Sequence, residues 1–201
     1  MINKSRGYKK NTVDFFNKMA EKNHGDSYRH YATVLSWISV EEDKKILDLG
    51  CGKGELLEQI KRKFDNFQLF GVDISPKMIE KARLKNDEIE FKVGDSENLD
   101  FSDNFFEVVT CLNSFHHYEN PEKSLAEMYR VLAPEGNLIL GEIYIVEILR
   151  GLINSTLPYG NTGDFRIYSP TEIKSLFQKA GFTFLKERFI LPSLKVYLFK
   201  K

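Results

Sequence analysis

The chain has 201 residues, with 29 basic and 29 acidic side chains, so its formal net charge is zero. This length fits one domain, and the balanced charge argues against a dominant nucleic-acid surface or a polybasic membrane anchor. The two cysteines form no CxxC pair, which argues against a zinc ribbon or a thioredoxin-type site. No signal peptide or bilayer-spanning run is evident, so we expect a cytoplasmic protein.

The first part of the chain, residues 11–39, is polar with apolar residues at helical spacing, which predicts two helices broken near Gly25. Short apolar runs then alternate with amphipathic stretches. Strands separated by single helices indicate βαβ units and a parallel sheet that is covered on both faces. The expected strands are Lys45–Leu49, Gln68–Val72, Ile89–Val93, Phe106–Thr110 and Asn137–Tyr144, and the expected helices are Glu55–Phe64, Pro76–Asn86 and Pro121–Leu132.

The last part of the chain predicts a different arrangement. A helix is expected from Ser169 to Ala180, where Gly181 ends it. The strand-like runs Phe182–Phe189 and Lys195–Lys200 follow with no room for a helix between them, so they should pair antiparallel. The expected fold is therefore a Rossmann-like, doubly wound α/β fold whose sheet is mostly parallel and has an antiparallel end.

A glycine-rich turn, Gly50, Gly52 and Gly54, connects the first of these strands to its helix. Glycines permit positive φ, and the following helix N-terminus attracts anionic or zwitterionic ligands. The pattern is D-x-G-x-G-x-G, with Asp48 suited to a ligand that carries an ammonium group. It departs from the dinucleotide fingerprint because Glu55, which would repel a pyrophosphate, stands where that fingerprint has its third glycine.

Two further acids stand where the second and third strands end. Asp73 is well placed to accept hydrogen bonds from ribose hydroxyls, and Asp95 from the amine of an adenine. Because the carboxyl ends of parallel strands meet at one edge of the sheet, these acids and the glycine turn should form one nucleoside-binding site.

Residues 45–145 resemble the core of class I S-adenosylmethionine-dependent methyltransferases, most closely the group with ubiquinone/menaquinone-type and other small-molecule enzymes. The resemblance implies a seven-stranded sheet with an antiparallel last strand, S-adenosylmethionine as cofactor and S-adenosylhomocysteine as product. It is carried by LDLGCGKG (47–54), GVDISPKMIEKAR (71–83), VGDSENLDF (93–101) and the segment 105–142.

The same resemblance assigns the cofactor contacts. The glycine loop would bind the methionine part, Asp73 the ribose, and Asp95 with Ser96 the adenine amine, while Ile74 packs on the adenine and Asn113 helps to hold the cofactor. The expected cofactor-binding residues are Asp48, Gly50, Cys51, Gly52, Gly54, Asp73, Ile74, Asp95, Ser96 and Asn113. Cys51 is interpreted as a small loop filler and not as a nucleophile.

The segment after the fourth strand, residues 112–118, would lie beside the methyl group. His116 or His117 can act as a general base because imidazole titrates near neutral pH. The alternative is that the pair packs under the cofactor or caps the next helix. A metal role is disfavoured because no acidic ligand cluster accompanies the two histidines.

The single domain, residues 1–201, divides into a helical cap (1–40), a cofactor-binding core (41–145), an insert (146–168) and a C-terminal helix with its hairpin (169–201). Insertions at the functional sheet edge often act as lids. The cap and the insert should therefore cover the site, although the insert's helix could equally pack on the core or on a second subunit. The expected substrate-binding residues are Tyr28, Tyr31, Tyr159, Arg166 and Tyr168.

Methyl transfer to a small molecule is the favoured function. The segment Asn-Ser-Phe-His at 113–116 differs from the [DN]PP[YW] motif of amino-methylating DNA enzymes, and Cys111 has no preceding proline as cytosine-C5 enzymes require. We expect a monomer or homodimer without a nucleic-acid partner. Two alternatives stay open: a non-catalytic cofactor-binding regulatory subunit and, less favoured, an NAD-dependent oxidoreductase.

Overall fold

A computed structural model describes residues 4–22, 29–39, 44–64, 66–157, 160 and 163–201. Its centre is a seven-stranded sheet in the order β3-β2-β1-β4-β5-β7-β6, in which only β7 runs antiparallel to its neighbours. The expected mostly parallel α/β fold is thereby confirmed. The strands are β1 Lys45–Leu49, β2 Gln68–Asp73, β3 Glu90–Val93, β4 Phe106–Leu112, β5 Leu132–Ile143, β6 Thr183–Ile190 and β7 Leu194–Lys200.

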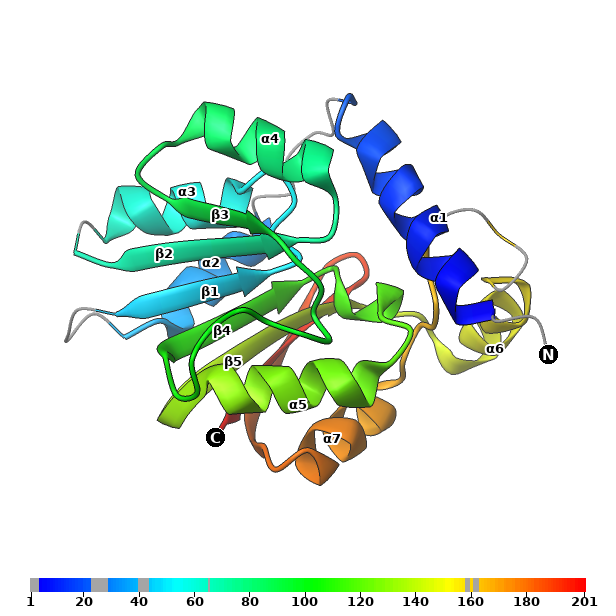
Figure 1. Ribbon diagram of the computed structural model, residues 1–201. Helices are drawn as coiled ribbons and strands as arrows, with labels where there is room; N and C mark the ends of the chain where they lie inside the picture. The colour runs from blue at the N-terminus through cyan, green and yellow to red at the C-terminus, as the bar shows by residue number, and fades with distance from the viewer. Residues whose placement is uncertain (1–3, 23–28, 40–43, 65, 158–159, 161–162) are drawn as a thin grey trace.

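Helices cover both faces of this sheet (Figure 1). Helices α2, α3 and α4 contribute to one buried apolar cluster, and α5 and α7 contribute to the other. The helices are α1 Lys4–Met19, α2 Arg29–Trp37, α3 Glu55–Lys63, α4 Pro76–Lys85, α5 Pro121–Val131, α6 Glu147–Thr156 and α7 Pro170–Lys179, with a 3₁₀ turn, η1, at Phe115–His117.

The two clusters cover the central strands with apolar packing on both faces. In β1, Leu47 and Leu49 belong to the cluster beneath α5 and α7, whereas Ile46 belongs to the cluster beneath α2, α3 and α4. All three side chains are buried. A parallel strand with helices on both sides therefore has apolar residues at successive buried positions. The polar residues of β1 are Lys45 at its start and Asp48 next to its carboxyl end.

Two helices, α4 and α7, begin with a serine side-chain cap. The Ser75 hydroxyl accepts the Met78 N–H at 3.2 Å, and Pro76 occupies the first turn, where a missing N–H costs little. Ser169 forms a capping box with Glu172 at the start of α7. The first of these caps fixes α4 directly behind the end of β2.

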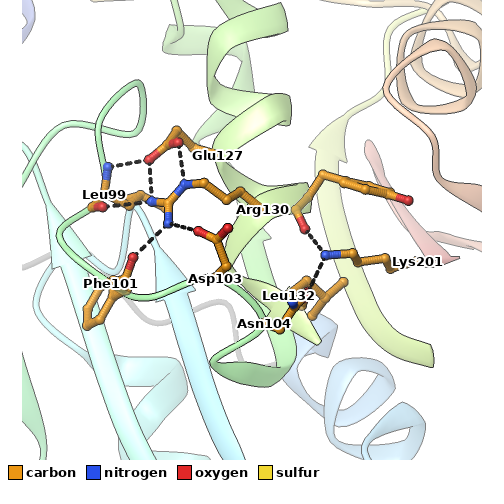
Figure 2. Close-up of polar contacts among 9 residues, drawn as sticks. Leu99, Phe101, Asp103, Asn104, Glu127, Arg130, Leu132 and Lys201 are labelled. Carbon is orange, nitrogen blue, oxygen red and sulfur yellow. Dashed lines mark hydrogen bonds and ion pairs between the residues drawn. The ribbon is translucent and has the colours of Figure 1, made fainter. Parts of the chain in front are cut away.

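Arg130 of α5 fixes the connection from β3 to β4 (Figure 2). Its guanidinium donates to the carbonyl oxygens of Leu99 and Phe101 at 2.9 and 2.7 Å, and it pairs with Asp103 and Glu127 at 2.8 Å each. Nearby, Lys201 Nζ donates to the carbonyl oxygen of Leu132 at 2.7 Å. Arg130 thus anchors the chain that follows Asp95.

Helix α1 does not pack on the sheet as α2 does. Val34 and Ile38, within and just after α2, belong to the core, whereas no described side chain of α1 belongs to either apolar cluster. Figure 1 shows α1 beyond the carboxyl ends of β1, β2 and β4. The expectation that two N-terminal helices cover the site is therefore wrong for α2. Within the described residues, no helix is long and apolar enough to cross a bilayer.

Candidate active site

A cavity of about 230 Å³ lies at the carboxyl ends of the strands, where the fold brings together the loops after β1, β2, β3 and β4. Its walls come from the glycine turn, from the ends of β2 and β3, and from the segment around η1. Helix α1 supplies the remaining wall with Tyr8, Lys9, Thr12 and Phe16. Of the expected cofactor residues, those that line the cavity are Gly50, Gly52, Asp73, Ile74, Asp95, Ser96 and Asn113.

The glycine turn needs its glycines for conformation and for space. Gly50, Gly52 and Gly54 have φ values of +77°, +54° and +81°. A Cβ on Gly50 would lie 2.0 Å from Ser114 Oγ, and one on Gly54 would lie 2.6 Å from the Phe91 ring. A Cβ on Gly52 would meet no atom within 4 Å, although this residue lines the cavity. Gly52 therefore leaves open space for a ligand to approach the backbone, which fits the methionine end of the expected cofactor.

Three expected loop contacts lie behind this wall and not on it. Gly54 is the N-cap of α3, and Cys51 is buried in the apolar cluster beneath that helix. Asp48 is buried below the turn, where its Oδ1 accepts the Thr110 hydroxyl at 2.6 Å. Glu55, whose charge argued against a pyrophosphate, is held by Lys85 at 2.8 Å. These residues therefore support the glycine turn from the side away from the cavity.

The electrostatics of Asp48 differ from those of an exposed carboxyl. Its pKa is raised to about 7, mainly by burial; the Thr110 hydrogen bond opposes this rise, and the nearby Asp73 adds to it. A cationic ligand group above the turn would favour the charged form of Asp48. This side chain can therefore respond to an ammonium group without direct contact.

Asp73 joins the glycine turn to the start of α4. Its Oδ2 accepts the Gly52 N–H at 2.9 Å and its Oδ1 accepts the Ser75 N–H at 2.8 Å. Burial raises the pKa of Asp73, and these two backbone bonds counteract part of that effect. Each carboxylate oxygen has a second lone pair, so Asp73 can still accept hydrogen bonds from two neighbouring hydroxyls on the cavity side.

The next acid along this edge, Asp95, is already engaged on both oxygens. Oδ1 accepts the Glu97 N–H at 3.0 Å, and Oδ2 is 2.7 Å from Lys9 Nζ of α1. Lys9 also lies 2.7 Å from Glu97 Oε1. Beside them, the Ser96 and Ser124 hydroxyls are 2.8 Å apart. An adenine amine that binds Asp95 must therefore share this carboxylate with Lys9 or displace it.

The two histidines occupy different environments. His116 is buried away from the cavity wall, with Nδ1 2.8 Å from Glu142 Oε2, and its carbonyl oxygen accepts the N–H groups of Phe165 and Arg166. Burial tends to lower the pKa of His116, but the Glu142 carboxylate outweighs this effect and raises it. His116 thus connects β5 to the insert and does not face a ligand.

His117 is the histidine that lines the cavity. Its Nδ1 donates to the Gly163 carbonyl oxygen at 2.8 Å, and its ring packs edge-on against Phe16 with centroids 4.8 Å apart. Burial, followed by the neighbouring His116, lowers its pKa to about 4. The ring is therefore neutral near pH 7, with Nδ1 protonated and Nε2 as its acceptor atom.

Acidic groups do accompany the histidine pair, contrary to the sequence argument against a metal. Asp164 of the insert and Glu142 of β5 reach the two rings, and ligand atoms of His116, His117 and Asp164 lie within 4.8 Å of one another. Nδ1 of each ring is engaged by Glu142 or Gly163. That no metal binds here therefore stays a prediction. Its basis is now that both Nδ1 atoms are used in hydrogen bonds, because acidic groups are in fact close to the histidines.

Three of the expected substrate-binding residues, Tyr31, Arg166 and Tyr168, are described by the structure, and none of the three lines the cavity. Tyr168 is buried in the core beneath α5 and α7, and Arg166 pairs with Glu172. Tyr31 packs against the opposite apolar cluster, beneath α2. These three assignments are corrected, because packing turns the side chains away from the cavity. Tyr28 and Tyr159 lie outside the described residues.

Four of the cavity residues that sequence reasoning missed come from one element, α1. Tyr8, Lys9, Thr12 and Phe16 recur at helical spacing, so they share one face. That periodicity was visible, but nothing in it says which face of α1 meets the cavity. The insert supports this helix: Tyr8 donates to the Gly163 carbonyl oxygen at 2.7 Å, and its ring meets Phe165. Other unanticipated lining residues include Met78, Glu97, Ser114, Tyr118 and Glu119.

Comparison with known proteins shows the family to which the chain belongs. Residues 47–140 match the methyltransferase domain family. A demethylmenaquinone methyltransferase of Thermotoga maritima is 27% identical, covering 87% of this chain and 89% of the relative. One from Thermus thermophilus is 31% identical over 70% of this chain and 74% of the relative. A Haloferax volcanii putative methyltransferase, in a complex with the Trm112 methyltransferase activator, has a TM-score of 0.80 at 22% identity, covering 94% and 96% of the two chains.

The chain belongs to the class I S-adenosylmethionine-dependent methyltransferases. Within that class it falls in the quinone-type group that its curated relatives represent, and it transfers a methyl group to a small-molecule acceptor. The fold likeness to the Haloferax protein agrees with this assignment but shows architecture only.

Proposed function

We propose that the cavity under α1 binds S-adenosylmethionine with its methionine part at the glycine turn, its ribose on Asp73 and its adenine beside Ile74, Asp95 and Ser96. The observation that carries this proposal is the joining of the glycine turn and both strand-end acids in one cavity. The open space above Gly52 supports the position of the methionine part. In this orientation the sulfonium faces Asn113 and the segment around η1.

The acceptor then lies between that segment and α1. S-Adenosylmethionine supplies the methyl group, which leaves its sulfur as the acceptor attacks in line, and the acceptor loses a proton. His117 is placed to receive this proton, because it lines the cavity and its Nδ1–H bond to Gly163 leaves Nε2 free to accept. His116 holds the adjacent turn in position through Glu142.

The acceptor class follows from the walls that the cofactor leaves uncovered. Phe16 and His117 present an aromatic edge, and Tyr8, Thr12 and Glu119 add polar atoms. A hydroxylated aromatic ring matches this mixture. The curated relatives are demethylmenaquinone methyltransferases. We propose a quinol-type acceptor, in which loss of a hydroxyl proton makes the ring carbon or oxygen nucleophilic.

Cofactor binding is tested by isothermal titration with S-adenosylhomocysteine. We expect one site per chain, and Asp73→Ala should weaken it about tenfold to a hundredfold because ribose hydrogen bonds are lost. Asp103→Asn, far from the cavity on the β3–β4 connection, should bind as the parent chain does. Unchanged affinity in Asp73→Ala would refute the ribose role, and no binding at millimolar ligand would refute the site.

Methyl transfer is tested by incubating the chain with radiolabelled S-adenosylmethionine and a reduced demethylmenaquinone analogue. Incorporation of label into the analogue supports the quinol-type acceptor, and His117→Ala should slow it at least tenfold while leaving S-adenosylhomocysteine affinity within about threefold. Cofactor binding without turnover on any small molecule would instead favour a regulatory subunit.

A further inference from the structure

Glu119 is a cavity residue whose chemistry the cofactor assignment does not use. It lies two residues beyond η1, between Tyr118 and the start of α5, and lines the cavity. Its Oε2 is buried and has no hydrogen-bond partner among the described residues. A buried carboxylate oxygen without a donor is unfavourable, so such an atom in a binding cavity indicates a missing ligand group.

The nearby donors of α1 are already committed elsewhere. Lys9 Nζ contacts Asp95 and Glu97, each at 2.7 Å, and the Tyr8 hydroxyl donates to the Gly163 carbonyl oxygen at 2.7 Å. In the proposed orientation, the ribose and adenine have partners at the ends of β2 and β3. Glu119 is thus left for the second ligand of the cavity, the methyl acceptor.

The charges around Glu119 indicate what kind of donor it takes. Lys9 acts on this carboxyl with a positive charge, and Glu97 acts on it with a negative one. Asp95, Glu97 and Glu119 outnumber the single ammonium group of Lys9, so this part of the cavity is acidic and takes a hydrogen-bond donor. A neutral hydroxyl group is such a donor, and it does not compete with Lys9 for Asp95 and Glu97. The aromatic edge of Phe16 and His117 provides a place for a ring that carries this hydroxyl.

We propose that Glu119 recognises the acceptor, with Oε2 accepting a hydrogen bond from a hydroxyl group of an aromatic, quinol-type molecule. The proposal rests on the proposed function, since it needs the cofactor to occupy the rest of the cavity. Glu119 is a binding residue in this account, and it sets the ring's orientation toward His117. A site with a carboxylate at this position should reject an analogue that lacks the hydroxyl, because the carboxylate then stays unpaired.

The test uses 1,4-dihydroxynaphthalene as the probe, kept reduced under nitrogen and titrated into the full chain saturated with S-adenosylhomocysteine. The parent chain should bind this diol at least tenfold tighter than 1,4-dimethoxynaphthalene, which has the same ring and no donor. Glu119→Gln should lose most of that discrimination while keeping its S-adenosylhomocysteine affinity within about twofold. Glu122→Gln, an exposed carboxyl in the first turn of α5, is the matched control and should behave as the parent.

Several outcomes would overturn the proposal. The first is that the parent chain binds the diol and the dimethoxy compound with equal affinity, or binds neither of them. The second is that Glu119→Gln still prefers the diol over the dimethoxy compound as strongly as the parent chain does. A loss of S-adenosylhomocysteine affinity in Glu119→Gln would place this carboxyl on the cofactor instead. Failure of the parent chain to bind S-adenosylhomocysteine would refute the proposed function itself. This binding is measured first, before any naphthalene compound is added.

Discussion

Asp48 is the residue whose protonation links the glycine turn to stability. It is buried, it accepts one hydroxyl hydrogen bond from Thr110, and its pKa rises from 3.8 to about 7. A carboxyl with a raised folded-state pKa favours folding most at low pH, when it is protonated in both states. That contribution declines as the pH rises from about 4 and is lost once the pH passes about 7.

We therefore predict that Asp48→Asn removes this pH dependence. The amide keeps the shape and the acceptor oxygen for Thr110 but cannot ionise. Between pH 5 and pH 8, the free energy of unfolding of the variant should gain about 2–3 kcal/mol relative to the parent, from about two pKa units at 1.36 kcal/mol each. Urea unfolding of the cofactor-free proteins at both pH values measures this gain. If the difference in unfolding free energy between variant and parent is the same at pH 5 and pH 8, the raised pKa of Asp48 is contradicted.

The strand-end acids show what can be inferred at the residue scale. Asp73 and Asp95 were predictable because a polar residue directly after a buried parallel strand must lie at the ligand edge of the sheet. Tyr31, Arg166 and Tyr168 were not, because a tyrosine or an arginine suits a binding site and a packed interface equally well. Only the fold shows that Tyr168 packs beneath α5 and α7 and that Arg166 pairs with Glu172.

At the scale of elements, α1 is held over the cavity mainly by contacts of its polar side chains. Lys9 binds Asp95 and Glu97, and Asn17 Oδ1 accepts the Ser75 hydroxyl at 2.8 Å. Ion pairs at partly exposed positions contribute little each, so this helix can open at modest cost. We predict that a cofactor enters when α1 opens.

Lys9→Met should accelerate cofactor exchange, because two of the contacts that close α1 are lost. We expect the association and dissociation rates of S-adenosylhomocysteine to rise about threefold to tenfold, as expected for the loss of one or two ion pairs of up to about 1 kcal/mol each. Stopped-flow fluorescence measures both rates. Lys10→Met removes an exposed charge from the same helix and should leave both rates unchanged. If Lys9→Met has the same rates as the parent chain, opening of α1 does not limit cofactor entry.

The connection between β3 and β4 depends on α5 in a comparable way, but more rigidly. We predict that Arg130→Met lowers the free energy of unfolding by about 2–4 kcal/mol, because the carbonyl oxygens of Leu99 and Phe101 and two carboxylates lose their shared donor. Denaturant titration measures the loss. Arg62→Met on the exposed side of α3 is the control. If Arg130→Met lowers the unfolding free energy as little as Arg62→Met does, the connection does not need the Arg130 guanidinium.

For the whole molecule, the alternation of strands and helices was enough to predict the parallel sheet and its antiparallel end. The glycine turn and the two acids were enough to predict a ligand site at one edge, and the structure joins them in one cavity there. The position of α1 was not predictable, because its face of Tyr8, Lys9, Thr12 and Phe16 could have met the sheet, the cavity or solvent. Contacts between distant segments, such as Glu142 with His116, likewise depend on the complete fold.

The proposed function depends on one cavity that holds the cofactor beneath α1. A crystal structure of the chain with S-adenosylhomocysteine tests this most directly. We predict ribose hydroxyls on Asp73, adenine beside Ile74 and Asp95, and the sulfur facing the side of the cavity formed by Asn113, His117 and Phe16. Density for the ligand outside this cavity, or a ribose without contact to Asp73, would contradict it.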